Sequence, residues 1–309
     1  MKKLKNKDLI SLNMLTIDEV NLIIQESDIM KKGPRNTDYL KGKTLAMIFE
    51  KSSTRTRVSF ETGIYQLGGT GMYFSAKDLQ MGRGETIHDT AKVLSRYVDG
   101  IMARTFAYKT VLDLAKYATV SVINGLTDYD HPCQVLSDLY TIYEKKGSLK
   151  GLNLTYIGDG NNVLHSLLQG AVKVGMNITY SSPGGYTPLP EVVSEAQEAA
   201  KQTDSKIEYI TNPANSVKNA DIIYTDVWVS MGHEGENQKR IKDLIPYQLN
   251  GDLMRHAKKD VLVMHCLPAH RGEEITDEVM DGPNSIVFDQ AENRLHTQKA
   301  IMKLLMQKD

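Results

Sequence analysis

The chain of 309 residues has little cysteine, almost no net charge and no long apolar run. Its two cysteines, Cys133 and Cys266, are too few for a framework of disulfide bonds. The formal net charge of −1 gives no long-range attraction for nucleic acid or for an anionic membrane. The basic N-terminus is followed by no apolar signal segment, and no apolar stretch is long enough to span a bilayer. We therefore expect a cytoplasmic protein without nucleic-acid or membrane partners, in which local basic residues hold any anionic ligand.

Short apolar runs recur along the chain at the spacing of strands that are connected by helices. The expected strands are Thr44–Phe49, Gly71–Phe74, Gly100–Ala103, Thr119–Ile123, Asn153–Gly158, Ile178–Ser181, Ile207–Ile210, Asp221–Thr225, Val261–His265 and Ile286–Phe288. Strands that alternate with helices predict parallel sheets covered by helices on both faces. The length predicts two domains, and the polar, glycine-containing stretch 145–151 is the best candidate for their boundary.

Local patterns also predict three helices. Thr16 and Glu19 form a capping-box pattern at the start of the first helix, which Gly33 and Pro34 end. Apolar residues share one face across residues 135–144, which predicts a second helix. The segment 292–309 has a helical pattern at the end of the chain.

The segment that follows the first expected strand, residues 50–61, is the strongest chemical signal. In open α/β sheets, ligands bind beyond the carboxyl ends of the strands, and this segment lies there and opens a helix. The hydroxyls of Ser53 and Thr56 and the guanidinium of Arg55 are donors suited to phosphate oxygens. A plain helix cap is the alternative, but Arg55 and Arg57 in a first helical turn oppose the helix dipole. We interpret the segment as a phosphate-binding site.

Two further signals in the first half follow strands. Arg104 comes directly after the third expected strand; taken alone it is better explained by a surface position, and it becomes a candidate only beside a second anion site. His131, Pro132, Cys133 and Gln134 form a tetrapeptide at a strand-to-helix turn, with Pro132 suited to the first helical position. His131 can donate to a carbonyl oxygen, and Gln134 offers an acceptor and a donor to an amide. A structural histidine is the alternative for His131 taken singly.

In the second half, Gly158-Asp159-Gly160 follows a strand but lacks the third glycine of a dinucleotide-binding turn, because position 163 is valine. A nucleotide-dependent dehydrogenase is therefore a weak alternative, and for this segment a plain glycine turn and a carboxylate site at Asn162 stay equally open. Asp226, after another expected strand, is suited to an ammonium group, although a helix cap or a solvated loop acid has the same pattern. The polar run from there to Arg240 is interpreted as a mobile loop that can close over substrate.

Late in the chain, His265-Cys266-Leu267-Pro268 follows an expected strand. A buried free cysteine is usually an inert small hydrophobe, so we expect Cys266 to make a polar contact to a ligand rather than to act as a nucleophile. Arg294, beside the last helix, is a further candidate anion donor, with a surface arginine as the alternative. The histidines and cysteines have no zinc-like spacing, so we expect no metal and no other cofactor.

Ser-Thr-Arg-Thr-Arg at 53–57, His-Pro-Cys-Gln at 131–134 and His-Cys-Leu-Pro at 265–268 resemble, in this order and spacing, the family of aspartate and ornithine carbamoyltransferases. The likeness covers nearly the whole chain, and Asp226 with Ser230-Met231-Gly232 resembles the ornithine branch. We therefore expect an α/β protein of two domains, each a parallel sheet flanked by helices, with the C-terminal helix packing back on the first domain. The resemblance implies a carbamoyl-phosphate-binding domain at 1–147, to which 292–309 returns, and an ornithine-binding domain at 148–291.

The resemblance also implies a reaction in arginine metabolism, the direct transfer of the carbamoyl group of carbamoyl phosphate to the δ-amine of L-ornithine, with citrulline and phosphate as products. The residues implied for carbamoyl phosphate are Ser53, Thr54, Arg55, Thr56, Gln80, Arg104, His131, Gln134, Cys266, Leu267 and Arg294. Those implied for ornithine are Asn162, Asp226, Ser230 and Met231. Arg104, His131 and Cys266 are the implied catalytic residues, and the Leu267–Pro268 bond is implied to be cis.

The family is typically trimeric, and Gln80 resembles the residue that a neighbouring subunit lends to the site, which implies a homotrimer or an assembly of trimers. Two alternatives are a carbamoyltransferase for another amine, such as putrescine or acetylornithine, and a non-catalytic relative with the same fold. The presence of Arg104, His131 and Cys266 argues against the second.

Overall fold

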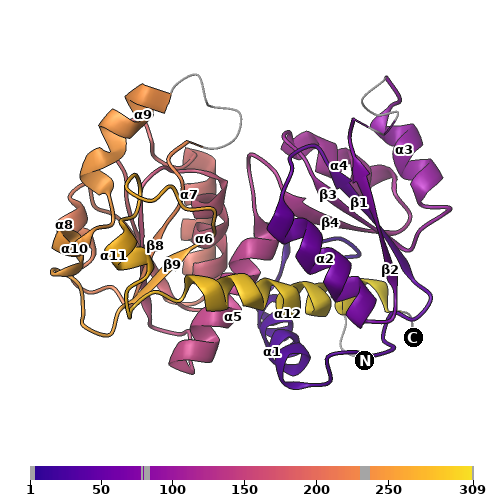
Figure 1. The fold of residues 1–309 in the computed structure, drawn as a ribbon, viewed down its shortest axis with the longest axis horizontal. Coiled ribbons are helices and arrows are strands. Elements are labelled where there is room, and N and C mark those ends of the chain that lie inside the picture. Colours follow the sequence, from indigo (N-terminus) through magenta and orange to yellow (C-terminus); the bar gives the residue numbers. More distant parts are fainter. Residues whose placement is uncertain (1–3, 78, 80–83, 230–236, 308–309) are drawn as a thin grey trace. The chain divides into compact units, whose positions relative to one another are not determined.

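The computed structural model describes residues 4–77, 79, 84–229 and 237–307, which form two compact units (Figure 1). Unit 1 comprises Met1–Tyr140 and Glu292–Asp309, and unit 2 comprises Thr141–Ala291. The division lies within helix α5 (Pro132–Lys146), just before the boundary expected from the sequence. Every helix in the described residues is too short or too polar to cross a membrane.

Unit 1 is built on a four-stranded parallel sheet with the strand order β2-β1-β3-β4. Its strands are β1 (Thr44–Phe49), β2 (Thr70–Ser75), β3 (Gly100–Arg104) and β4 (Ser121–Leu126). The two central strands are almost wholly buried, whereas the edge strand β2 is partly exposed. Because all four strands are parallel, the segments that follow β1, β3 and β4 leave the sheet at the same edge.

Helices connect and cover these strands. They are α1 (Ile17–Lys32), α2 (Thr54–Gln66), α3 (Ile87–Leu94), α4 (Tyr108–Tyr117) and the first part of α5, with a short 3-10 turn at Leu12–Met14. The predicted capping box is confirmed at α1: Thr16 Oγ1 accepts from the backbone N–H of Glu19 at 3.2 Å, and Glu19 Oε2 accepts from that of Thr16 at 2.8 Å. The helix ends at Lys32, and Gly33 is its C-cap, as the sequence predicts.

The C-terminal helix α12 (Val287–Met306) packs back on unit 1, which confirms the prediction for the end of the chain. Lys303 on α12 forms an ion pair with Glu26 on α1 at 2.8 Å. A Cβ atom on Gly63 of α2 would lie only 2.9 Å from Met302 Cε, so α2 and α12 are in close contact there. Only glycine or a shift of the methionine side chain permits this spacing.

Unit 2 contains a five-stranded parallel sheet with the strand order β7-β6-β5-β8-β9. Its strands are β5 (Asn153–Ile157), β6 (Asn177–Ser181), β7 (Ile207–Tyr209), β8 (Ile222–Thr225) and β9 (Leu262–His265). Its helices are α6 (Asn162–Lys173), α7 (Pro190–Ala200), α8 (Pro213–Ser216), α9 (Asn237–Leu244), α10 (Gly251–Met254) and α11 (Asp277–Met280), with a 3-10 turn at Ile245–Tyr247. The prediction of parallel sheets flanked by helices is thus confirmed in both units.

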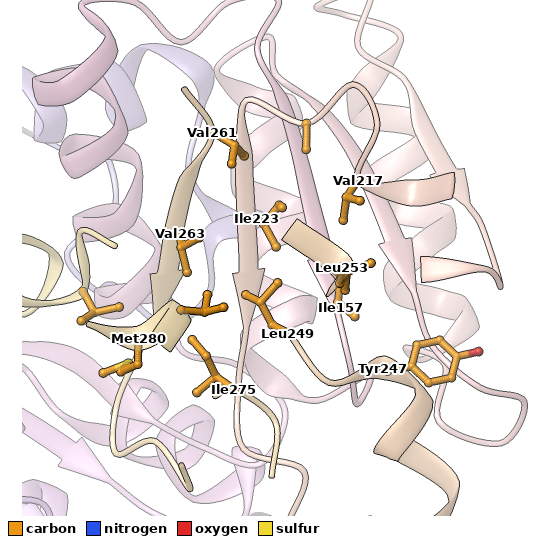
Figure 2. Close-up of a cluster of buried hydrophobic side chains, with 13 residues drawn as sticks. Ile157, Val217, Ile223, Tyr247, Leu249, Leu253, Val261, Val263, Ile275 and Met280 are labelled. Carbon is orange, nitrogen blue, oxygen red and sulfur yellow. The ribbon is translucent and has the colours of Figure 1, made fainter. Parts of the chain in front are cut away.

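A cluster of buried apolar side chains covers one face of the unit 2 sheet (Figure 2). Ile157, Ile223 and Val263 come from three neighbouring strands, and Leu249 and Ile275 approach them from the segments that cross this face. All five are fully buried. This cluster anchors β5, β8 and β9, whose carboxyl ends carry the polar residues described below.

One expected strand is wrong. Residues 286–288 do not continue the unit 2 sheet, because only Ser285 makes an isolated bridge to Val263 and α12 begins at Val287. Ile286 is buried, whereas Phe288 is 67% exposed, which is the burial change of a helix leaving the core. A run of three apolar residues fits a strand and a helix equally well, and here the tertiary position decided between them.

Candidate active site

The start of α2 lies directly after β1, where the phosphate-binding motif was predicted. Ser53 is the N-cap of α2, and its Oγ accepts from the backbone N–H of Thr56 at 3.2 Å. The cap that the sequence offered as an alternative is therefore present. Thr54 is the first helical residue and is exposed, whereas Thr56 is fully buried and its hydroxyl also accepts from Ser53 Oγ at 3.2 Å.

The two arginines of this turn have different surroundings. Arg57 is exposed, lies 3.3 Å from Glu61 one helical turn later and stacks over the ring of Tyr73 at 3.9 Å. Arg55 is partly buried, and no carboxylate pairs with it among the residues that the structure describes. The helix dipole and Arg55 together place uncompensated positive charge at this terminus, which favours an anionic ligand.

Arg104 and His131 are brought to the same edge of the unit 1 sheet. Arg104 is the last residue of β3 and pairs in register with Phe49, the last residue of β1, so it lies beside the start of the α2 motif. Its carbonyl accepts from the backbone N–H of Glu50 at 2.8 Å. His131 directly precedes α5, whose first residue is Pro132 as predicted. Both Arg104 and His131 are buried.

His131 is held in its neutral form by its surroundings. Burial lowers its pKa well below the ordinary value, and the positive charges of Arg294 and Arg104 lower it further. A neutral imidazole keeps one N–H donor and one acceptor. At neutral pH this site therefore contains two permanent cations and an uncharged histidine, a combination that suits a ligand with anionic and carbonyl oxygens.

Gln134 and Arg294, on α5 and α12, are joined by hydrogen bonds inside unit 1. Arg294 Nη1 donates to Gln134 Oε1 at 3.0 Å, and Arg294 Nη2 donates to Thr56 Oγ1 at 3.0 Å. Gln134 Nε2 donates in turn to Asp138 Oδ1 at 2.8 Å. Thus Arg294 is not a surface residue, and the structure links it to two residues of the predicted carbamoyl-phosphate set. Asp138 was missed because a single acid inside a helix carries no signal by itself.

In unit 2, Asp226 follows β8 and is buried. Its carboxylate accepts from Cys266 Sγ at 2.9 Å and from Asn161 Nδ2 at 2.7 Å. Asn161 is the N-cap of α6, and its Oδ1 accepts from the backbone N–H groups of Val163 and Leu164. Asn162 is the first residue of α6 and is partly buried. The sequence identified Asn162 and Asp226 as site residues but missed Asn161, which joins Asp226 to the start of α6 by hydrogen bonds.

The glycine turn before α6 is closed by protein rather than open to a nucleotide. A Cβ on Gly160 would lie 2.4 Å from the backbone nitrogen of Pro188, so another chain segment occupies the space beside it. Gly158 has a φ of +129°, which only glycine adopts without strain. Asp159 forms a partly buried ion pair with Arg240, whose Nε also donates to the carbonyl of Trp228 at 2.9 Å. This packing favours the structural interpretation of the turn over a dinucleotide site.

The segment after β9 is fixed by a buried histidine. His265 and Glu274 are both fully buried, with His265 Nε2 and Glu274 Oε1 3.0 Å apart. His265 Nδ1 accepts from the backbone N–H of Leu267 at 2.8 Å, so Nε2 carries the proton and donates to Glu274. Leu267 has a φ of 60°, and the predicted cis bond to Pro268 is present. Glu274 was missed from the sequence because it lies on a later turn.

The two cysteines differ in environment. Cys133 is fully buried, and burial raises the pKa of its thiol to about 12. Cys266 is partly exposed and donates to Asp226.

Two groups of side chains have potential metal-ligand atoms within 4.8 Å of one another: Asp226, His265 and Cys266, and His270, Glu273 and Glu274. Hydrogen bonds within the protein account for the first group, because both nitrogens of His265 are engaged. Gln80, Ser230 and Met231 lie outside the described residues.

Comparison with known proteins was consistent along the whole chain. A family model described as "Aspartate/ornithine carbamoyltransferase, carbamoyl-P binding domain" matches residues 7–144, and one described as "Aspartate/ornithine carbamoyltransferase, Asp/Orn binding domain" matches residues 150–305. Proteins named ornithine carbamoyltransferase from Oceanobacillus iheyensis and Thermococcus kodakarensis are 59% and 56% identical in sequence to this chain. These alignments cover 99% and 98% of this chain and 96% and 97% of the relatives. The solved ornithine carbamoyltransferase of Pyrococcus furiosus superposes with a TM-score of 0.95 at 53% identity, covering 99% of both chains.

Proposed function

Because the chain belongs to the aspartate/ornithine carbamoyltransferase family and is an enzyme of that family, we propose that it transfers the carbamoyl group of carbamoyl phosphate to the δ-amine of L-ornithine. The products are L-citrulline and phosphate, which makes the reaction a step of arginine metabolism. The observation that carries the proposal is the identity of more than half of the residues, over almost the full length, with proteins named ornithine carbamoyltransferase. The site geometry in each unit supports it.

In the proposal, the start of α2 binds the phosphate group. The backbone N–H groups of the first turn and the side chains of Ser53, Thr54, Arg55 and Thr56 supply the donors. The support is the position of Arg55, a partly buried cation without a carboxylate partner in the described part of the chain, at a positive helix end. Arg104, buried at the adjacent strand end, contacts both the phosphate and the carbonyl oxygen.

The carbamoyl end is bound by His131, Gln134 and Arg294. Neutral His131 donates a hydrogen bond to the carbonyl oxygen, while Gln134 Oε1 accepts from the carbamoyl NH₂. The support is the lowered pKa of His131 and the hydrogen bond from Arg294, which turns the oxygen of Gln134 toward the basic groups. The backbone segment at Cys266 and Leu267, held by His265, contributes further carbamoyl contacts that the family resemblance implies.

Ornithine is bound by residues that follow the strands of unit 2. Asp226 pairs with the α-ammonium, because it is a buried carboxylate at a strand end. Asn162 binds the α-carboxylate at the positive N-terminus of α6. Ser230 and Met231, which are outside the described residues, are assigned to the same substrate by resemblance alone.

The reaction is a direct displacement at the carbamoyl carbon. The unprotonated δ-nitrogen of ornithine attacks this carbon, a C–N bond forms, and negative charge develops on the carbonyl oxygen. Arg104, His131 and the Thr56 hydroxyl stabilise this charge, a contribution of roughly 3–4 kcal/mol for each well-placed donor. The C–O bond to phosphate then breaks, and the leaving phosphate takes the proton from the new C–N group. This route needs no protein base and no covalent intermediate.

We also propose a cytoplasmic homotrimer or an assembly of trimers. Val58 and Tyr65, which are two helical turns apart on one face of α2, are 54% and 73% exposed, and this apolar strip on unit 1 supports self-association. Gln80, the residue that resembles one lent by a neighbouring subunit, is outside the described residues. Light scattering combined with gel filtration tests the proposal, and a mass of one chain would refute it.

The test of the proposed function is a colorimetric citrulline assay. Carbamoyl phosphate is kept at fixed concentration while ornithine, putrescine, N-acetylornithine and aspartate are compared as acceptors, with phosphate release measured in parallel. A kcat/KM for ornithine far above the others supports the proposal. Preference for another amine would keep the phosphate site and overturn the assignment of Asp226 and Asn162. No transfer to any acceptor would favour the non-catalytic relative.

A further inference from the structure

Gln134 lies in a buried chain of hydrogen bonds between a guanidinium and a carboxyl group in unit 1. Arg294 Nη1 donates to Gln134 Oε1 at 3.0 Å, and Gln134 Nε2 donates to Asp138 Oδ1 at 2.8 Å. The three side chains are 4%, 1% and 0% exposed. Gln134 and Asp138 are one helical turn apart on α5, so the helix itself holds this pair at bonding distance.

The two neighbours dictate which way the Gln134 carboxamide faces. A guanidinium has only donors, so the atom that faces Arg294 must be the amide oxygen. The atom that faces Asp138 must then be the amide nitrogen, and a carboxyl oxygen is its acceptor. A rotation of the carboxamide by 180° would set N–H against N–H at one end and oxygen against oxygen at the other, in a site where all three side chains are buried.

The position of Arg294 does not depend on Asp138. Its second terminal nitrogen donates to Thr56 Oγ1 at 3.0 Å, and that hydroxyl is fixed by the cap of α2 through Ser53. Arg294 uses one of the two lone pairs of Gln134 Oε1. The second lone pair is available to a ligand, and the hydrogen bond that Gln134 Nε2 donates to the Asp138 carboxyl group strengthens the amide oxygen as an acceptor.

We propose that Asp138 is a positioning residue that fixes the oxygen of Gln134 toward the substrate and thereby makes the site select a carbamoyl group over an acetyl group; the inference rests on the proposed function. Carbamoyl phosphate and acetyl phosphate have the same phosphate and carbonyl and differ only in NH₂ against CH₃. Their sizes are similar, so a steric pocket separates them poorly. A fixed hydrogen-bond acceptor separates them, because the methyl group leaves it unpaired.

Without Asp138, the nitrogen of Gln134 loses its acceptor and the carboxamide is held at one end only. It then spends part of its time rotated, with its own NH₂ facing that of the substrate. The expected loss of binding affinity is confined to ligands that carry the carbamoyl NH₂. If Asp138 had a purely structural role, its removal would instead weaken the binding of carbamoyl phosphate and acetyl phosphate alike.

The experiment compares the full-length wild type with Asp138→Leu, which removes the acceptor but keeps a side chain branched at the same carbon, and with Asp138→Asn, which retains an acceptor oxygen. Citrulline formation gives the KM for carbamoyl phosphate, and competitive inhibition by acetyl phosphate gives its Ki. For Asp138→Leu we expect the KM to rise about five- to tenfold, the worth of one hydrogen bond, while the Ki changes less than about twofold. Asp138→Asn should restore most of the wild-type ratio of Ki to KM.

Equal changes of KM and Ki in Asp138→Leu would overturn the inference, as would a wild-type Ki for acetyl phosphate equal to the KM for carbamoyl phosphate. If Asp138→Leu does not fold, as judged by circular dichroism, Asp138→Ala removes the same acceptor without added bulk and is measured in its place. Failure of the proposed function has a different signature, because the wild type would then form no citrulline. If the wild type forms citrulline but Asp138→Leu has the same ratio of Ki for acetyl phosphate to KM for carbamoyl phosphate, only the role of Asp138 is rejected and the proposed function stands.

Discussion

Replacing His131 by asparagine should make the folded protein less sensitive to acid. His131 is 4% exposed, and its burial, together with the charges of Arg294 and Arg104, lowers its pKa well below 6.5. The folded chain therefore keeps His131 neutral at a pH at which the unfolded chain binds a proton there. Asparagine is polar and of similar reach but does not titrate. The substitution therefore removes this one proton from the difference in bound protons between the unfolded and folded states.

The sign and size of the effect follow from proton linkage. Well above pH 6.5 neither state is protonated at His131, and the histidine contributes no pH dependence. As the pH falls through 6.5 toward the lower pKa of the folded state, the unfolded state alone gains the proton and stability is lost. With an unfolded pKa near 6.5, lowering the pH from 7.5 to 5.5 costs the wild type about 1.4 kcal/mol at this one residue.

The assay is urea unfolding followed by far-ultraviolet circular dichroism at pH 7.5 and pH 5.5. Fluorescence is unsuitable, because the single tryptophan, Trp228, lies in unit 2 whereas His131 lies in unit 1. Between the two pH values, His131→Asn should lose about 1.4 kcal/mol less stability than the wild type. His256→Asn, at an exposed position, controls for the substitution itself. If the free energy of unfolding has the same pH dependence in the wild type and in His131→Asn, the conclusion that folding keeps His131 neutral is refuted.

Three further predictions address the phosphate motif, the thiols and the first helix. Arg55→Ala should raise the KM for carbamoyl phosphate at least about tenfold and lower kcat, whereas Arg57→Ala, which breaks an exposed ion pair, should stay within about twofold in steady-state citrulline assays; equal effects would contradict the assignment. A thiol reagent at pH 8 should label only Cys266 in the native protein, because Cys133 is buried with a pKa of about 12, and mass spectrometry of the labelled peptides would expose the opposite result. Thr16→Ala should lower the free energy of unfolding by about 1 kcal/mol through loss of the α1 cap, with no change in citrulline formation.

Local patterns were sufficient for much of the fold. The capping box at Thr16 and Glu19 is formed as predicted, and the strand Thr44–Phe49 has the predicted bounds. These features depend on side chains a few residues apart, which the sequence displays directly. The prediction of a strand at 286–288 was wrong, because a short apolar run fits a strand and a helix equally well. The choice between them depended on the burial of Val287 among unit 2 side chains that are distant in sequence.

The sequence by itself determined which chemical groups the site has: a helix start rich in hydroxyls and arginine, a histidine and an amide at a strand end, and a carboxylate suited to an ammonium. The tertiary structure alone decided how those groups are oriented and charged. Arg294 orients Gln134 across 160 positions of sequence, and the same arginine helps to keep His131 neutral. The physical reason is that hydrogen-bond direction and protonation depend on desolvation and on neighbours that only folding brings within a few ångströms.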